Sequence, residues 1–138
     1  MRRSVLTCGT SVGFVESDRI GVVMMEEIVD ESGLASAMKL SQTHPVFLFK
    51  HSTTCPVSST AYREVAAYVE GRGDLPPVYL IKVIESRPVS NAISASTGVV
   101  HQSPQLILVA DEKAVWDASH YQISAEKIVK AASSSSPT

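Results

Sequence analysis

One cysteine carries the clearest chemical signal in this chain of 138 residues. Cys55 follows a continuous apolar run at 46–49 that ends in Lys50, and it stands immediately before Pro56, where a pattern of helical spacing begins. A cysteine at the start of a helix faces free backbone N–H groups and the positive end of the helix dipole, and both favour thiolate over thiol. The thiolate is the nucleophile in thiol–disulfide exchange. The position of Cys55 therefore predicts a redox-active thiol at the edge of a sheet.

The residue three positions after Cys55 indicates which kind of thiol chemistry to expect. A dithiol oxidoreductase carries its second cysteine at that position, and this chain has Ser58 there. The only other cysteine, Cys8, lies in a different sequence context near the N-terminus. We therefore predict a single-thiol site that an external thiol reduces. Two alternatives stay open: Cys8 could act as a resolving thiol, or Cys55 could be an inert core residue.

Several neighbours of Cys55 could stabilise a thiolate. His51 and the lysine before it lie upstream and could supply positive charge. The hydroxyl of Thr54 could donate a hydrogen bond to the sulfur, and Ser58 could do so from one turn along the helix. Pro56 suits the first helical position, because its missing N–H would have no acceptor there. The alternative roles are packing in the loop for His51 and a solvated first-turn position for Ser58.

Composition and charge exclude several classes of protein. The chain is 44% hydrophobic and 19% charged, which is typical of a globular domain rather than a disordered one. A net charge of -2 gives no electrostatic reason to expect a nucleic-acid partner, and no apolar run is long enough to span a membrane. With two cysteines, a chain of this length needs no disulfide scaffold, so we expect a reducing compartment, the cytoplasm. The four histidines lack metal-ligand spacing, so no metal site is expected.

The two ends of the chain differ from its centre. Residues 1–25 are predicted to form an N-terminal extension: a short strand, a disordered arm, or a stretch upstream of the true start, which would then be Met24 or Met25. They are too polar and too interrupted by charge for a secretory signal. Residues 26–132 form the predicted folded domain, and the serine-rich residues 133–138 form a disordered tail.

The pattern between these ends alternates helices and strands. Helices are predicted at 28–40, 56–70, 89–96 and 125–131, and strands at 46–49, 78–84, 105–109 and 114–116. Ser32 and Ser124 are expected to cap the first and last helices, and Gly98 to end the third. A helical crossover makes the first two strands parallel, and a tight turn joins the last two as a hairpin. The prediction is an α/β fold: a four-stranded mixed sheet with helices on both faces, the thioredoxin-like arrangement.

Three sequence runs carry a resemblance to a known family. Residues 49–58, 83–91 and 101–105 together resemble the monothiol bacilliredoxins, the bacillithiol-system redox-active proteins of the YtxJ type. The resemblance implies a thioredoxin-like cytosolic enzyme that removes bacillithiol from mixed disulfides on client proteins. It also implies bacillithiol as a thiol co-substrate and no bound cofactor. Carried over to matching positions, Cys55 is the attacking thiol, and residues 56–58 complete the motif.

A second site feature is Ser103–Pro104, immediately before the strand at 105–109. In thioredoxin-like folds a cis proline faces the cysteine and presents the backbone of the preceding residue to the substrate. Position and resemblance together imply this substrate-binding role for Ser103 and Pro104. The alternative is an ordinary trans proline at the start of a strand.

Other functions are alternatives on the same scaffold. One is an iron–sulfur carrier like the monothiol glutaredoxins, although these have a flexible glycine after the cysteine where this chain has Pro56. Another is a peroxidase, because Ser52-x-x-Cys55 resembles the peroxidase Thr-x-x-Cys, although Leu48 stands where a proline is expected. The last is a non-catalytic interaction domain linked to stress response, since a fold does not determine function.

Overall fold

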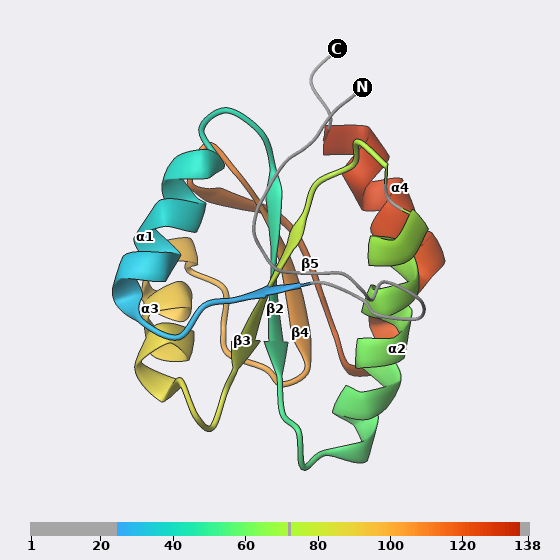
Figure 1. Cartoon of the computed structure of the whole chain (residues 1–138), viewed down its shortest axis with the longest axis horizontal. Coiled ribbons are helices and arrows are strands. Elements are labelled where there is room, and N and C mark those ends of the chain that lie inside the picture. The colour runs from blue at the N-terminus through green and yellow to red at the C-terminus, as the bar shows by residue number, and fades with distance from the viewer. Residues whose placement is uncertain (1–24, 72, 136–138) are drawn as a thin grey trace, which may run out of the picture.

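The computed structural model describes residues 25–71 and 73–135 (Figure 1). Its elements are, in chain order, β1 (Glu26–Glu27), α1 (Glu31–Leu40), β2 (Val46–His51), α2 (Pro56–Gly71), β3 (Val78–Lys82), α3 (Arg87–Thr97), β4 (Gln105–Ala110), β5 (Lys113–Ser119), the short 3₁₀ helix η3 (His120–Gln122) and α4 (Ala125–Ser135). The expectations for the first 24 residues, Cys8 among them, and for residues 136–138 lie outside the described part of the chain.

The described sheet has five strands in the order β1-β3-β2-β4-β5. The strand β3 is parallel to both β1 and β2, whereas β4 is antiparallel to β2 and forms a hairpin with β5. The expected mixed sheet and its parallel and antiparallel pairs are therefore confirmed, with one strand more than expected. The additional strand, β1, is two exposed glutamates at the sheet edge, and two charged residues give no apolar alternation to detect.

Helices cover both faces of the sheet, as expected. Figure 1 shows α1 and α3 on one side of the sheet and α2 and α4 on the other. Every residue of β2 is buried, and its side chains alternate between two cores. Phe47 and Phe49 pack towards α2 and α4, and Val46 and Leu48 pack towards α1 and α3. The strand that leads to Cys55 is thus fixed by apolar contacts on both faces.

Several local signals in the sequence correspond to the structure. Pro56 is the first residue of α2, and Gly98 ends α3 with a φ of 74°, a left-handed conformation that glycine adopts without strain. Ser124 caps α4 by accepting a hydrogen bond from the N–H of Lys127 at 3.3 Å. The last helix continues to Ser135, so three residues of the segment expected as a tail are helical, because Ala132 is fully buried in the last turns.

The first helix starts later than expected and has a different cap. Its N-cap is Asp30 rather than Ser32, and the Asp30 carboxylate accepts a hydrogen bond from the N–H of Gly33 at 2.8 Å. Ile28 lies outside the helix, since its N–H donates to the carbonyl of Leu80 at 2.8 Å and so continues the pairing of β1 with β3. The apolar residues that were predicted as one helix therefore belong to two segments: Ile28 continues the strand pairing, and the others lie in α1.

The predicted site residues come together at the end of the sheet where β2 stops and β4 begins. The strand β2 ends at His51 and leads directly into the Cys55 loop. Because β4 runs antiparallel to β2, its first residue, Gln105, lies opposite Lys50 at that same edge. The Ser103–Pro104 bond immediately precedes Gln105, so the topology places it at the edge that carries the thiol loop.

Candidate active site

Cys55 occupies the N-cap of α2. Its carbonyl accepts the first intrahelical hydrogen bond, from the N–H of Ser59 at 3.1 Å, and its own N–H donates to the carbonyl of Ser52 at 3.4 Å. An N-cap side chain lies over the N–H groups of the second and third helical residues, here Val57 and Ser58. Cys55 is half-buried, so its sulfur is not enclosed in the core. The backbone is held in place while the side chain stays within reach of a ligand.

Ser58, in the position of a second thiol, is fully buried. Its hydroxyl accepts a hydrogen bond from the N–H of Ser52 at 2.9 Å and lies 2.7 Å from Nδ1 of His51. The side chain is therefore neither solvated nor bonded to the thiol: within the described residues, no hydrogen bond joins it to Cys55. It connects the end of β2 to the first turn of α2 instead.

His51 is one of the buried polar residues beside the thiol loop. Its ring stacks on that of Phe49 with centroids 5.5 Å apart and lies 5.1 Å from that of Tyr62. Its Nδ1 is bonded to the Ser58 hydroxyl, as described above. The imidazole is thus packed between β2 and α2 rather than extended towards solvent. This is the packing alternative that the sequence left open.

The environment of His51 also determines its charge. Burial lowers the pKa of His51 from its ordinary value of 6.5, and the charge of Lys82 lowers it further. Glu85 and a hydrogen bond to the backbone of Ser58 raise the pKa of His51 without reversing the shift. A lowered pKa keeps the imidazole neutral near neutral pH. His51 therefore does not supply the positive charge that its position in the sequence suggested.

Thr54 lies on the exposed side of the loop. Its hydroxyl is 3.2 Å from that of Ser52, so the two side chains form a hydrogen bond across the turn before Cys55. In the described part of the chain, no hydrogen bond from Thr54 to the sulfur is present. The thiolate-stabilising role of Thr54 stays a prediction, and the contact that the structure provides is a local one within the loop.

The Ser103–Pro104 peptide bond is cis, as the sequence and the resemblance implied. Pro104 is buried, and its carbonyl accepts a hydrogen bond from the N–H of His120 at 3.1 Å, which ties the loop to the end of β5. The Ser103 hydroxyl is buried and has no hydrogen-bond partner among the described residues. A buried hydroxyl without a partner is unusual in a folded protein, and a bound water or a polar group of a ligand would satisfy it. The substrate-binding role of both residues stays a prediction.

The sequence did not reveal the surroundings of Lys50. This residue is fully buried at the end of β2, on the face opposite to His51. Its ammonium lies 3.1 Å from the hydroxyl of Ser94 and 3.2 Å from Nδ1 of His101. Burial lowers the pKa of Lys50 to about 8. A lysine directly after four apolar residues was visible in the sequence, but its partners are 44 and 51 residues away.

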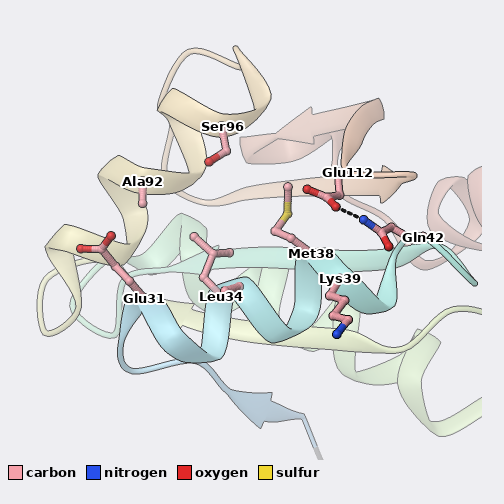
Figure 2. A pocket seen from close by; sticks show the side chains of 9 residues that line it. Glu31, Leu34, Met38, Lys39, Gln42, Ala92, Ser96 and Glu112 are labelled. Carbon is pink, nitrogen blue, oxygen red and sulfur yellow. Dashed lines mark hydrogen bonds between the residues drawn. The ribbon is translucent and has the colours of Figure 1, made fainter.

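A cavity between the first and third helices contains none of the residues of the thiol loop. It has a volume of about 640 Å³ and is lined mainly by residues of α1 and α3, among them Leu34, Met38, Ala92 and Ser96. Figure 2 shows these side chains together with Glu112, which is hydrogen-bonded to Gln42. None of the predicted site residues lines this cavity, so it gives no support to the thiol chemistry.

Over residues 25–71 and 73–135, no group of three or more histidine, cysteine, aspartate or glutamate side chains is arranged to hold a metal ion. In the same residues, no helix has the length and the apolar character that crossing a membrane requires.

Comparison with known proteins identifies the family. Residues 26–128 match the family described as monothiol bacilliredoxin BrxC, which is most of the chain and nearly all of its described part. The chain belongs to the monothiol bacilliredoxin family. This membership agrees with the single thiol at the start of α2 and with Ser58 in place of a second cysteine.

Solved structures agree with the fold. A protein described provisionally as an oxidoreductase with a thioredoxin fold is 26% identical, with a TM-score of 0.71 over 78% of this chain and 92% of its own. A thioredoxin from Fasciola hepatica is 12% identical, with a TM-score of 0.65 over 80% and 99%. A thioredoxin variant from Halobacterium salinarum is 16% identical, with a TM-score of 0.66 over 82% and 91%. The fold is thioredoxin-like, and family and fold together support a thiol oxidoreductase.

Proposed function

We propose that this bacilliredoxin removes bacillithiol from mixed disulfides on client proteins, with Cys55 as the attacking thiol. The observation that carries the proposal is the geometry at the start of α2. A half-buried cysteine occupies the N-cap, and a buried serine occupies the place of the second thiol. Family membership supports the same chemistry.

The first step is a thiol–disulfide exchange. The Cys55 thiolate attacks the bacillithiol sulfur of the mixed disulfide, and a new bond forms between these two sulfur atoms as the bond to the client sulfur breaks. The client sulfur leaves as a thiolate and takes a proton from solvent. The N–H groups of the first turn of α2 and the helix dipole stabilise the attacking thiolate.

The second step regenerates the enzyme. Since a hydroxyl occupies the Ser58 position, that residue cannot displace bacillithiol from Cys55. A second low-molecular-weight thiol, bacillithiol itself, attacks the bacillithiol sulfur as a thiolate. The products are bacillithiol disulfide and the Cys55 thiolate, so each turnover converts one mixed disulfide and one free bacillithiol into one client thiol and one bacillithiol disulfide. Because this cycle needs reduced bacillithiol, we also propose that the protein works in a reducing compartment, the cytoplasm.

The Ser103–Pro104 loop is proposed to hold the client. The loop lies at the sheet edge that carries the thiol, and its Ser103 hydroxyl has no partner among the described residues. A client segment in extended conformation would pair with the backbone there through main-chain hydrogen bonds. Recognition through main-chain groups needs no particular client sequence, which suits an enzyme with several clients.

The proposal is tested on a protein that carries bacillithiol on a single cysteine. Intact-mass spectrometry follows loss of the adduct in the presence of reduced bacillithiol, with the wild type, Cys55→Ser and Cys8→Ser compared. We expect the wild type and Cys8→Ser to remove the adduct at equal rates and Cys55→Ser to remove none. Turnover by folded Cys55→Ser would contradict the proposal.

The same preparations separate the alternatives. A visible-absorbing cluster after anaerobic reconstitution with iron and sulfide would favour the iron–sulfur carrier. Peroxide consumption with an external thiol would favour the peroxidase. Adduct loss that is no faster with the wild type than without protein would favour a non-catalytic domain.

A further inference from the structure

A polar cluster behind the Ser103–Pro104 loop is not used by the chemistry proposed above. It consists of Lys50 from the end of β2, Ser90 and Ser94 from α3, and His101 from the loop before β4. The Lys50 ammonium lies 3.1 Å from the Ser94 hydroxyl and 3.2 Å from Nδ1 of His101, and the Ser90 hydroxyl lies 3.3 Å from the same nitrogen. Lys50 and Ser90 are buried, whereas His101 is exposed. The cluster thus extends from the interior to the surface.

The cluster has a surplus of positive charge. Within the described residues, Lys50 forms no ion pair, and its hydrogen-bond partners are a hydroxyl and an imidazole. Burial lowers the pKa of His101, and the charges of Lys50 and Arg87 lower it further, so the imidazole is neutral. A buried ammonium is costly unless a counter-charge is nearby. An anion bound at the surface of this cluster would supply that charge.

The hydrogen bonds also determine which ring nitrogen of His101 carries the proton. An ammonium group only donates hydrogen bonds, so Nδ1 of His101 accepts from Lys50 while Lys50 is charged. The proton of the neutral ring is then on Nε2. Since His101 is exposed, Lys50 leaves it with one N–H donor for a ligand at the surface.

The loop that carries His101 is fixed at the site edge. Gln105 lies directly opposite Lys50 in the pairing of β4 with β2, and it is buried. Its side chain donates a hydrogen bond to the carbonyl of Val100 at 3.0 Å and accepts one from the N–H of Gln102 at 3.4 Å. These two bonds hold the residues on either side of His101. The imidazole is three residues before Pro104, at the sheet edge from which the Cys55 loop leaves.

We propose that His101, with Lys50 behind it, forms a subsite that binds a carboxylate of the ligand reacting at Cys55. His101 contacts the carboxylate through Nε2–H, and Lys50 is a positioning residue that acts through the imidazole and adds its charge. The inference rests on the proposed function for the identity of the reaction. It adds a subsite on the protein that recognises a carboxylate of the small thiol, the chemical class that a cationic subsite selects.

The first experiment compares two disulfides that react with Cys55. Dithiodiglycolate carries two carboxylates, and 2-hydroxyethyl disulfide is neutral. The ratio of their rates with the wild type, Lys50→Met and His101→Ala isolates the effect of charge from the reactivity of the thiol. We expect the ratio to fall about fivefold in both variants, with the neutral rate unchanged. Lys113→Met removes the same charge at the opposite sheet edge and should leave the ratio unchanged.

The outcomes of this experiment are distinct. A fall in both rates by the same factor would mean that the cluster only supports the fold, and an unchanged ratio would mean that it binds no carboxylate. Either result overturns the inference. His101→Gln retains an N–H donor, so partial recovery of the ratio relative to His101→Ala supports direct contact.

A second arm distinguishes the two sources of a carboxylate. Peptides carrying 2-mercaptoethanol on a cysteine, with glutamate or glutamine beside that cysteine, place the charge on the client instead of on the small thiol. If the Lys50→Met effect appears with dithiodiglycolate and not with the glutamate peptide, the small thiol is the source. An effect confined to the glutamate peptide overturns the assignment to the small thiol.

A third arm does not require a reactive thiol. In Cys55→Ser, sodium acetate should shift the imidazole resonances of His101 relative to sodium chloride at equal ionic strength, and Lys50→Met should reduce the shift. If bacillithiol removal fails but this shift is present, the subsite stands and the proposed function does not. If no shift occurs in Cys55→Ser, the inference fails whatever the outcome for bacillithiol. Should Lys50→Met not fold, His101→Ala and His101→Gln decide the rate comparison alone.

Discussion

Two neighbouring residues at the end of β2 have opposite environments. The His51 side chain points towards α2, where it stacks on Phe49 and is bonded to Ser58. The Lys50 side chain points towards α3, where its partners are Ser94 and His101. Both are buried polar residues in the same strand. His51 is neutral and connects the thiol loop to the fold, whereas Lys50 is a charge without a counter-charge among the described residues. The comparison suggests different roles for the two faces at this end of β2. On the α2 face His51 stabilises the fold, and on the α3 face Lys50 belongs to the proposed carboxylate subsite.

The largest expected effect is on stability and comes from replacing His51. His51→Ala removes a buried stacked ring and one of the two hydrogen-bond partners of the Ser58 hydroxyl, so it should lower the free energy of unfolding by about 2–4 kcal/mol. Denaturant unfolding measures the change. The control is His44→Ala, which removes an exposed imidazole and should have little effect. Equal effects of the two substitutions would show that the stacking of His51 contributes nothing specific.

Substitution of the neighbouring residue should act in the opposite direction. Lys50→Met replaces a buried ammonium by an apolar side chain of similar length, so it should raise the free energy of unfolding by about 1–2 kcal/mol at pH 7. The gain should shrink above pH 8. Because the folded pKa of Lys50, about 8, lies below its ordinary value of 10.5, the folded wild type loses its proton first and gains stability with rising pH. Loss of stability in Lys50→Met at pH 7 would mean that the ammonium is already compensated in the free protein.

Ser58→Ala should have a smaller effect than His51→Ala. It retains the small buried volume but leaves the Ser52 N–H and the His51 ring without their partner, at a cost of about 1–2 kcal/mol. The control Ser59→Ala changes an exposed serine one position later. If Ser58→Ala also slows the reaction of Cys55 with 2-hydroxyethyl disulfide, the hydrogen bonds of Ser58 to Ser52 and His51 also position the thiol. If only stability changes, its role is confined to the fold.

The smallest expected effect is a dependence of stability on acid. The unfolded chain takes up a proton on His51 near the ordinary pKa of 6.5, and the folded protein does so only at lower pH, because burial lowers the pKa of His51. The free energy of unfolding should therefore fall as pH drops below about 6.5. His51→Phe keeps an aromatic ring and should have a shallower slope between pH 7 and 5, as measured by denaturant unfolding. An unchanged slope would assign the acid sensitivity to other groups, such as His101, whose pKa is also lowered.

The parts of the fold that were predicted from sequence rest on local chemistry. Pro56 at the start of α2, Gly98 at the end of α3 and the hairpin of β4 with β5 each follow from a few adjacent residues. The strand β1 was missed because its two residues pair with β3 without any apolar signal. The cap of α1 was assigned to Ser32 instead of Asp30, since either residue can serve and only the position of Ile28 decides.

The candidate site divides in the same way. The position of Cys55 at a helix start and the cis bond before β4 were predictable from motif and order. The partners of Ser58 and of Lys50 were not, because each bond joins side chains whose rotamers depend on packing. The link between Lys50 and His101 spans 51 residues and two elements, and no local pattern contains both. Long-range polar contacts are thus the part of the site that only a structure reveals.

The placement of the sole tryptophan has a practical consequence for all of these measurements. Trp116 pairs with Leu108 in the middle of the hairpin and packs edge-on against Phe47, near the beginning of β2, whereas the thiol loop follows the end of that strand. Its fluorescence should therefore report unfolding and stay insensitive to the oxidation state of the sulfur. Tryptophan fluorescence can therefore follow folding, whereas the redox cycle of Cys55 has to be followed by a change in mass.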